Sequence, residues 1–175
     1  MADYLSPTVI QPAIPVGDMT PLECLLLSQI FNTEAQGDRL YFHAGEGPAS
    51  MIWLDRAVLE AALTQSQSAS GNTASAIVIR RLAPIPADNV EIELDFSDLS
   101  WQEIFQDIVR RSATIRYVTA VSAFTCTGTT MPPDAFGGMA LVITASDVMG
   151  KSTNDIIQDF LNQAVPGWAA EHAAA

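Results

Sequence analysis

A Gly-Lys-Ser triplet near the C-terminal end is the part of this sequence that comes nearest to a catalytic or nucleotide-binding motif. Gly150, Lys151 and Ser152 close the segment ASDVMGKS, which fits a loose Walker A pattern with alanine in place of the first glycine. Lys151 is also the only lysine of the chain. A phosphate-binding loop needs more glycines, so that backbone amides can wrap the anion, and Asp147 would repel that anion. We therefore expect a surface turn and a helix cap here, and nucleotide binding is the weaker alternative.

The histidine and cysteine side chains offer little for acid–base or nucleophilic catalysis. His43 ends a strand-like run beside Gly45, where a general base could sit, and His172 lies close to the chain end. Cys24 falls within an apolar helical run and Cys126 within a strand-like run, so we expect buried, unreactive thiols. The sequence has no Gly-x-Ser-x-Gly elbow, no His-x-x-x-His pair and no cysteine cluster. It predicts no catalytic residue, metal ligand or cofactor, and an enzyme acting at His43 or at the triplet is a minor alternative.

An alternating run predicts a strand with one apolar face and one acidic face. The apolar positions are Val90, Ile92, Leu94 and Phe96, and the acidic positions are Glu91, Glu93 and Asp95, with Asp98 nearby. Side chains on one strand face are about 6.6 Å apart, which is wide for joint ligation of one hard cation. The spacing suits a row of basic groups on a partner, so these four acids are the predicted partner-binding residues. It also resembles a run of backbone phosphates, which makes nucleic-acid mimicry a second hypothesis, and a solvated strand face is the simplest alternative.

The charge balance excludes some classes of partner. Twenty acidic residues and eight basic ones give a formal net charge of −12. Such a charge opposes direct contact with nucleic acid and with anionic membranes, and it favours basic protein partners and solubility. No apolar stretch approaches the length of about 18 residues that a membrane-spanning helix needs. The N-terminus lacks the pattern of a secretory signal and the cysteines follow no disulfide pattern, so we expect a cytoplasmic protein.

Four helices have recognisable starts in the sequence. Thr20, Pro21 and Glu23 form a capping box, Asp55 can cap a helix to about Gln65, Ser100 and Glu103 form a second box, and Ser152 can cap the helix 153–164. The spacing of Asp107 and Arg111 allows them to pair at i,i+4. The predicted inward positions are Leu22, Leu25, Leu26, Ile30 and Phe31; Val58, Leu59, Ala62 and Leu63; Trp101, Ile104, Phe105 and Ile108; and Ile156, Ile157, Phe160 and Leu161. The segment 76–82 fits either a strand or a helix end.

The predicted strands do not alternate regularly with the helices. We expect strands over 39–43, 51–53, 89–96, 115–126 and 139–144, the last two joined by the loop 131–138 without a helix and therefore antiparallel. This order predicts an α+β fold with a mostly antiparallel sheet and about four helices packed on it. We divide the chain into an extended, proline-rich apolar arm (1–19), a single domain (20–165) and a flexible tail (166–175). The arm either packs on its own sheet or adds to a neighbour's sheet edge, which would give a homo-oligomer.

These observations favour a non-catalytic, acidic binding or assembly protein that acts through protein–protein contacts. The first alternative is an inhibitor that mimics nucleic acid for a protein with a basic groove. The second is an enzyme or nucleotide binder that uses Gly150, Lys151 and Ser152 or the loop at His43.

Overall fold

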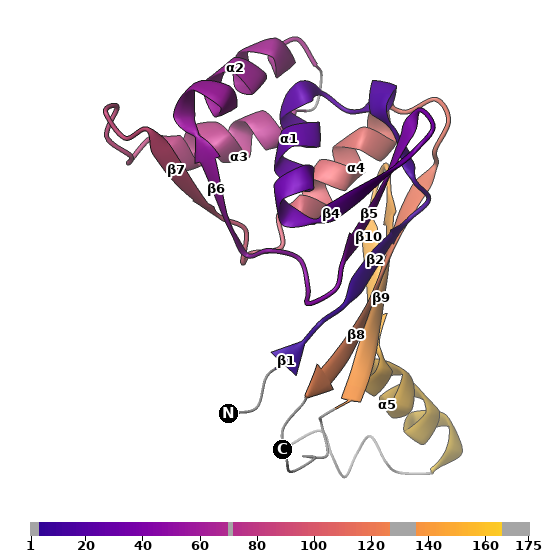
Figure 1. Cartoon of the computed structure of the whole chain (residues 1–175). Helices are drawn as coiled ribbons and strands as arrows, with labels where there is room; N and C mark the ends of the chain where they lie inside the picture. The colour runs from indigo at the N-terminus through magenta and orange to yellow at the C-terminus, as the bar shows by residue number, and fades with distance from the viewer. Residues whose placement is uncertain (1–3, 70–71, 127–135, 166–175) are drawn as a thin grey trace.

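The fold combines one large antiparallel sheet with helices, as the computed structural model of the chain shows over residues 4–69, 72–126 and 136–165 (Figure 1). The helices are α1 (Pro21–Ile30), α2 (Arg56–Ser66), α3 (Thr73–Leu82), α4 (Trp101–Arg111) and α5 (Thr153–Ala164), with a short 3-10 turn at Val16–Asp18. The strands are β1 (Tyr4–Leu5), β2 (Thr8–Gln11), β3 (Ile14–Pro15), β4 (Asn32–Gln36), β5 (Arg39–Ala44), β6 (Met51–Asp55), β7 (Glu91–Asp95), β8 (Tyr117–Cys126), β9 (Phe136–Thr144) and β10 (Val148–Ser152). The predicted α+β class, antiparallel sheet and single domain are confirmed.

The N-terminal segment lies inside the main sheet. β2 pairs with β8 on one side and with β5 on the other, and β3 continues along β5 after a break at residues 12 and 13. β9 and β10 extend the sheet beyond β8, while β4 forms the opposite edge beside β5. The segment therefore packs within its own sheet, the first of the two arrangements that the sequence allowed.

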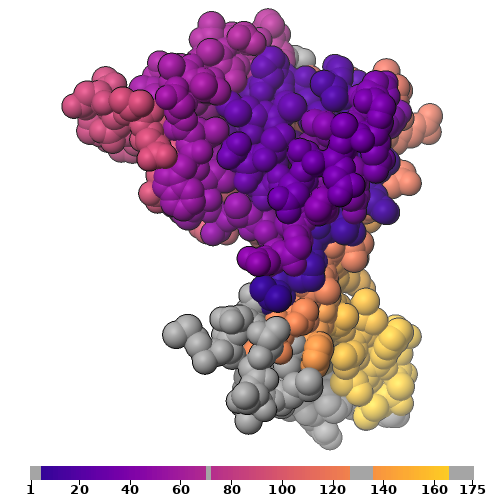
Figure 2. Space-filling view, in the orientation of Figure 1, coloured from indigo at the N-terminus to yellow at the C-terminus, as the bar shows by residue number. Residues whose placement is uncertain are grey.

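The helices α1 and α4 pack on one face of this sheet, and the opposite face has no helix of the described residues on it. In Figure 1 the helices α1–α4 gather around one end of the sheet, while β8 and β9 continue past them toward α5. Figure 2 shows α5, in yellow, set apart from the part of the molecule that these helices form. A second, two-stranded sheet of β6 and β7 lies beside α2 and α3. The predicted tail (166–175), His172 and residues 131–135 of the predicted loop lie outside the described residues.

Aromatic side chains form the centre of the core between α1, α4 and β5. Phe31 contacts Trp101 edge to face with ring centroids 5.3 Å apart, and Phe105 lies 5.7 Å from Phe42 and 6.0 Å from Phe31. All four side chains are buried, as the periodicity of the helix 101–111 predicted for Trp101 and Phe105. Edge-to-face pairs of this kind add to the hydrophobic gain of burying large rings.

Two buried carboxylates join the helices. Glu23 completes the predicted capping box of α1, and Arg111 of α4 donates to both of its carboxylate oxygens at 2.7 and 2.5 Å. Asp107, also buried, accepts a hydrogen bond from the backbone N–H of Thr73 at 2.7 Å, at the N-terminus of α3. A helix N-terminus favours a negative charge, so Asp107 ties α4 to α3. The pairing of Asp107 with Arg111 that the spacing allows is not the one observed, because Arg111 pairs with Glu23 and Asp107 pairs with Arg110.

Several other predictions of local structure are corrected. The segment 76–82 belongs to a fifth helix, α3, which Asn72 caps by accepting from the N–H of Ser75. Ser100 makes no capping box with Glu103, because its hydroxyl accepts a hydrogen bond from Arg81 and its N–H donates to Asp98. Val58 and Val90 are exposed rather than inward. So are Ile156, Ile157 and Phe160, and α5 has no buried residue at all.

Phe105→Ala tests whether the aromatic cluster holds the helical part together. Phe105 is fully buried among three other rings, so its loss should lower the free energy of unfolding by about 3–5 kcal/mol. Chemical denaturation monitored by circular dichroism measures this change. Phe160→Ala is the matched control, because that ring is 63% exposed and its removal should have little effect. Equal small effects would place Phe105 outside the core.

Candidate functional site

The acidic residues Glu91, Glu93 and Asp95 lie side by side on the exposed face of β7. Ile92 and Leu94 point the other way into the core, so the predicted alternation over the strand is confirmed. The carboxylates of Glu91 and Glu93 make no hydrogen bond or ion pair within the described part of the chain. Asp95 is engaged locally, and hydrogen bonds from the side chain and N–H of Ser97 lower the pKa of its carboxyl group.

An exposed tryptophan stands among these acids. Trp53 on β6 is paired directly opposite Glu93 in the two-stranded sheet, so the two side chains share one face. The indole is 55% exposed and borders a hollow of about 440 Å³. The hollow is lined by Trp53, Pro84, Ile85, Pro86, Asn89, Glu91 and Glu93. An indole face and carboxylates together attract an organic cation such as an arginine or lysine head group. We call Trp53, Glu91 and Glu93 the acidic face.

Asp98 lies apart from the acidic face. Its carboxylate accepts hydrogen bonds from Arg81 at 2.8 Å and from the N–H of Ser100 at 3.1 Å. Partial burial raises the pKa of Asp98, but the bonds from Ser100 and Arg81 outweigh it and hold that pKa below its ordinary value. Arg81 in turn lies over the ring of Phe96 at 4.3 Å. Asp98 is thus occupied in joining α3 to the turn before α4.

The Gly-Lys-Ser triplet lies in a strand. Gly150 and Lys151 belong to β10 and pair with Leu141 and Ala140 of β9 in an antiparallel hairpin. A methyl group added at Gly150 would come within 2.3 Å of the side chain of Leu141, so this glycine allows Leu141 to lie across the strand. A phosphate-binding loop leads from a strand through free backbone amides into a helix, and a paired strand offers no such cradle.

Lys151 connects β10 to α5. Its ammonium group pairs with Asp159, and the hydrogen bond and charge of Asp159 raise the pKa of Lys151. Ser152 makes the predicted N-cap of α5, in a capping box with Asp155, whose pKa is lowered by the hydrogen bonds from Ser152. Both side chains of the suspected nucleotide motif are thus used to attach and cap one helix.

His43 is not placed beside either cysteine. It stacks on Tyr41 with ring centroids 5.4 Å apart, and its Nε2 lies 3.3 Å from a carboxylate oxygen of Glu34. Val9 pairs with His43 on one side and with Val121 of β8 on the other. Cys126 lies five residues farther along β8, which corresponds to about 17 Å of strand. Cys24 is in α1, on the other side of the sheet, so His43 pairs with neither cysteine. Cys126 is buried as predicted, whereas Cys24 is only partly buried.

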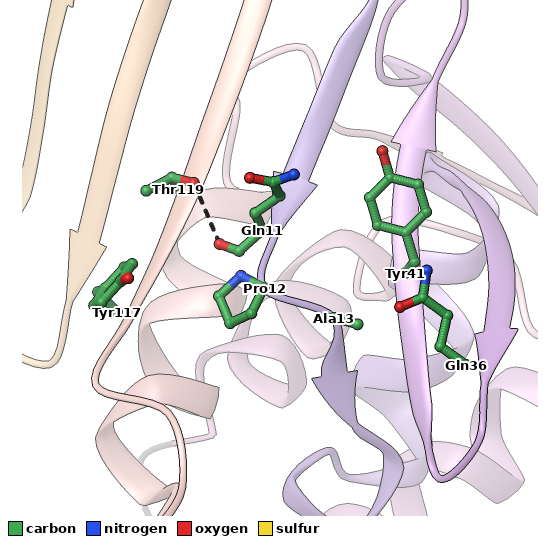
Figure 3. Close-up of a pocket in the computed structure, with 7 residues that line it drawn as sticks. All are labelled: Gln11, Pro12, Ala13, Gln36, Tyr41, Tyr117 and Thr119. Atoms are coloured by element: carbon green, nitrogen blue, oxygen red, sulfur yellow. Dashed lines mark hydrogen bonds between the residues drawn. The ribbon is translucent and has the colours of Figure 1, made fainter.

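Two features escaped the sequence analysis. The first is the apolar side of α5, where Ile156, Ile157 and Phe160 are exposed. We call these three residues the α5 face. The periodicity of α5 identified the three side chains but not that they stay exposed in the described part of the chain. The second is a hollow of about 590 Å³ on the face of the main sheet that no described helix covers. No local pattern predicts it, because its residues come from β2, β4, β5 and β8 (Figure 3).

Comparison with known proteins gives no relative. No protein-family model, no curated protein and no solved structure matches the chain. Within the described ranges, no three histidine, cysteine or acidic side chains are grouped so that they could hold a metal ion. Among the helices that the structure describes, none is long and apolar enough to cross a bilayer.

Substitution of the triplet separates a structural role from a nucleotide-binding role. Gly150→Ala should lower the free energy of unfolding by about 1–3 kcal/mol, because the added methyl group overlaps Leu141. In the double variant with Leu141→Ala the two effects should be less than additive, since the overlap is gone. Urea denaturation measures both.

Lys151→Ala is the matching test of nucleotide binding. We expect no saturable binding of ATP or GTP with magnesium by calorimetry, in either the native chain or the variant. Micromolar binding that disappears in the variant would overturn the structural interpretation of the triplet.

Proposed function

We propose that this chain is a non-catalytic binding or assembly protein, and that it docks onto a protein partner through the α5 face. The observation that carries the proposal is the exposure of Ile156, Ile157 and Phe160 on a helix with no buried residue. Residues three and four apart in a helix share one side, so these side chains form a continuous apolar surface. Grouped, exposed apolar side chains of this kind mark interaction sites.

The attachment of α5 supports the same proposal. Polar contacts help to hold the helix in place. Among the described residues they include the capping box of Ser152, the Lys151–Asp159 pair and a hydrogen bond from the N–H of Gly138 to Thr153 at 3.3 Å. A helix of this length is only marginally stable in water by itself, and helices in proteins gain most of their stability from burial of an apolar side. A partner that covers the α5 face would supply that burial.

A second candidate function is the recognition of a basic partner at the acidic face. The exposed indole of Trp53 beside Glu91 and Glu93 favours it over a merely solvated strand. The net charge of −12 would speed the approach of a basic protein. Nucleic-acid mimicry is the narrower form of this function, in which the partner normally binds DNA or RNA. We place the chain in the cytoplasm, which agrees with the free thiols of Cys24 and Cys126.

Ile157→Ser combined with Phe160→Ser tests the α5 face. The free energy of unfolding should change by no more than about 0.5 kcal/mol per substitution, because both side chains are exposed. Self-association in sedimentation velocity, or capture of a partner from native extract, should fall by about tenfold or more. Val58→Ser with Ile79→Ser is the matched control, since these side chains are 51% and 56% exposed on α2 and α3. Equal association of both double variants would exclude the α5 face.

Glu91→Gln, Glu93→Gln and Asp95→Gln together test the acidic face. Removal of these three like charges should weaken binding to a basic partner. The stability of the free protein should change little, because the loss of the Asp95–Ser97 hydrogen bond offsets the relief of repulsion. The remaining binding should depend less on salt, because exposed charge pairs are screened within about 10 Å at 0.1 M salt. Binding is measured over a salt series by surface plasmon resonance.

The control for this variant removes the same charge elsewhere. Asp38→Asn, Glu46→Gln and Glu103→Gln are exposed positions away from β7, so that triple variant should bind nearly as the native chain does. Equal binding of both triple variants would exclude the acidic face as the binding surface. Duplex DNA that fails to compete for the partner would exclude mimicry and leave an ordinary protein surface.

A further inference from the structure

The hollow on the uncovered face of the main sheet forms where its central strand is interrupted. β2 ends at Gln11 and β3 begins at Ile14, so Pro12 and Ala13 pair with neither neighbour as strand residues. The gap opens a space of about 590 Å³, within the range of about 300–1,000 Å³ that ligand pockets occupy. It is lined by Gln11, Pro12, Ala13, Gln36, Tyr41, Tyr117 and Thr119 (Figure 3).

Two tyrosine rings stand on either side of this gap. Figure 3 shows Tyr117 on β8 and Tyr41 on β5, with Pro12 and Ala13 between them. Tyr117 is 53% exposed, so its ring is available to a ligand. The CH face of a pyranose ring is apolar and packs on aromatic rings, whose faces carry partial negative charge.

The polar groups around the gap all both donate and accept hydrogen bonds. They are the carboxamides of Gln11 and Gln36, the phenols of Tyr41 and Tyr117 and the hydroxyl of Thr119. Thr119 donates to the carbonyl of Gln11 at 3.3 Å. The other four side chains make no hydrogen bond within the described ranges. Sugar hydroxyls also donate and accept, so they match such groups, whereas the carbonyls of a proline-rich peptide only accept. No charged side chain lines this first hollow, and the nearby Arg39 donates to the carbonyl of Ala13 at 3.2 Å. This lining disfavours phosphorylated or acidic ligands.

The space continues along the sheet. A second hollow of about 390 Å³ shares Tyr41 and follows Val9 and Val121, with His43 and Glu34 on its wall. The two hollows together offer room for several linked rings rather than one. We call the two hollows together the trough. We propose that the trough is a binding site for a neutral oligosaccharide, stacked on Tyr41 and Tyr117 and hydrogen-bonded by Gln11 and Gln36. The proposal is independent of the α5 face and of the acidic face.

An NMR titration of the full chain tests the proposal. Maltotetraose, cellotetraose and mannotetraose are each added to ¹⁵N-labelled protein up to about 10 mM, enough to detect a Kd on the order of 1 mM. At least one should shift the amide signals of residues 11, 13, 36, 41, 117 and 119 in a saturable way. Trigalacturonic acid, an anionic comparator, should not. Tyr41→Ala and Tyr117→Ala should each weaken binding about tenfold.

The control variant is Trp53→Ala, which removes an exposed aromatic ring at the acidic face and should bind the saccharide as the native chain does. If Tyr41→Ala fails to fold, Tyr117→Ala alone tests the proposal, because Tyr117 is exposed. Absence of shifts with all three neutral sugars overturns the proposal. So does binding that survives Tyr117→Ala, equal or tighter binding of the anionic sugar, or a proline-rich decapeptide that binds where the neutral sugars do not.

Discussion

The pairing of β2 with two strands that lie far from each other in the sequence is the constraint on which the rest of the fold depends. Thr8–Gln11 is hydrogen-bonded to β8 on one side, and its first two residues pair with β5 on the other. Among the described strands, β2 is the link between the β8–β9–β10 half of the sheet and the β4–β5 half. Thr8 is buried and its hydroxyl bonds to Ser122, 114 residues away. The trough opens where β2 ends at Gln11. Thr8, where β2 begins, pairs with Ser122, and β8 and β9 continue beyond that pair toward α5.

The prolines explain both the position of this segment and why the sequence analysis did not find it. A proline lacks the N–H that a central strand needs, so prolines are usually confined to edges and breaks. Here Pro7 and Pro12 flank β2, and pairing is restricted to the four residues between them. Local periodicity contains no information about the pairing of β2 with β8, whose contacting residues are 108 to 114 positions apart in the sequence. A proline-rich run is by itself typical of an extended arm. The arm was therefore predicted as extended and apolar but not as the centre of the sheet.

Features that depend on neighbouring residues were predictable, and features that depend on distant ones were not. The caps at Thr20, Asp55 and Ser152 and the alternation of β7 were all found from the sequence. Ser100 has the spacing of a capping box, but Leu99 adopts a left-handed backbone conformation and Arg81 takes the serine hydroxyl. In the same way, periodicity marks the apolar side of α5 without showing whether the chain itself covers it.

The use of each carboxylate narrows the acidic surface to a few groups. Glu23 and Asp107 are buried and paired within the helical part, and Asp98 is held by Arg81 and Ser100. On the exposed side of β6 and β7, Asp55 caps α2 and Asp95 accepts from Ser97. Glu91 and Glu93 are left as neighbouring like charges without a partner in the described ranges, beside the indole of Trp53. Their repulsion is relieved by solvent or by a cation, so under the second candidate function a basic partner would place its charge between these two glutamates and the tryptophan.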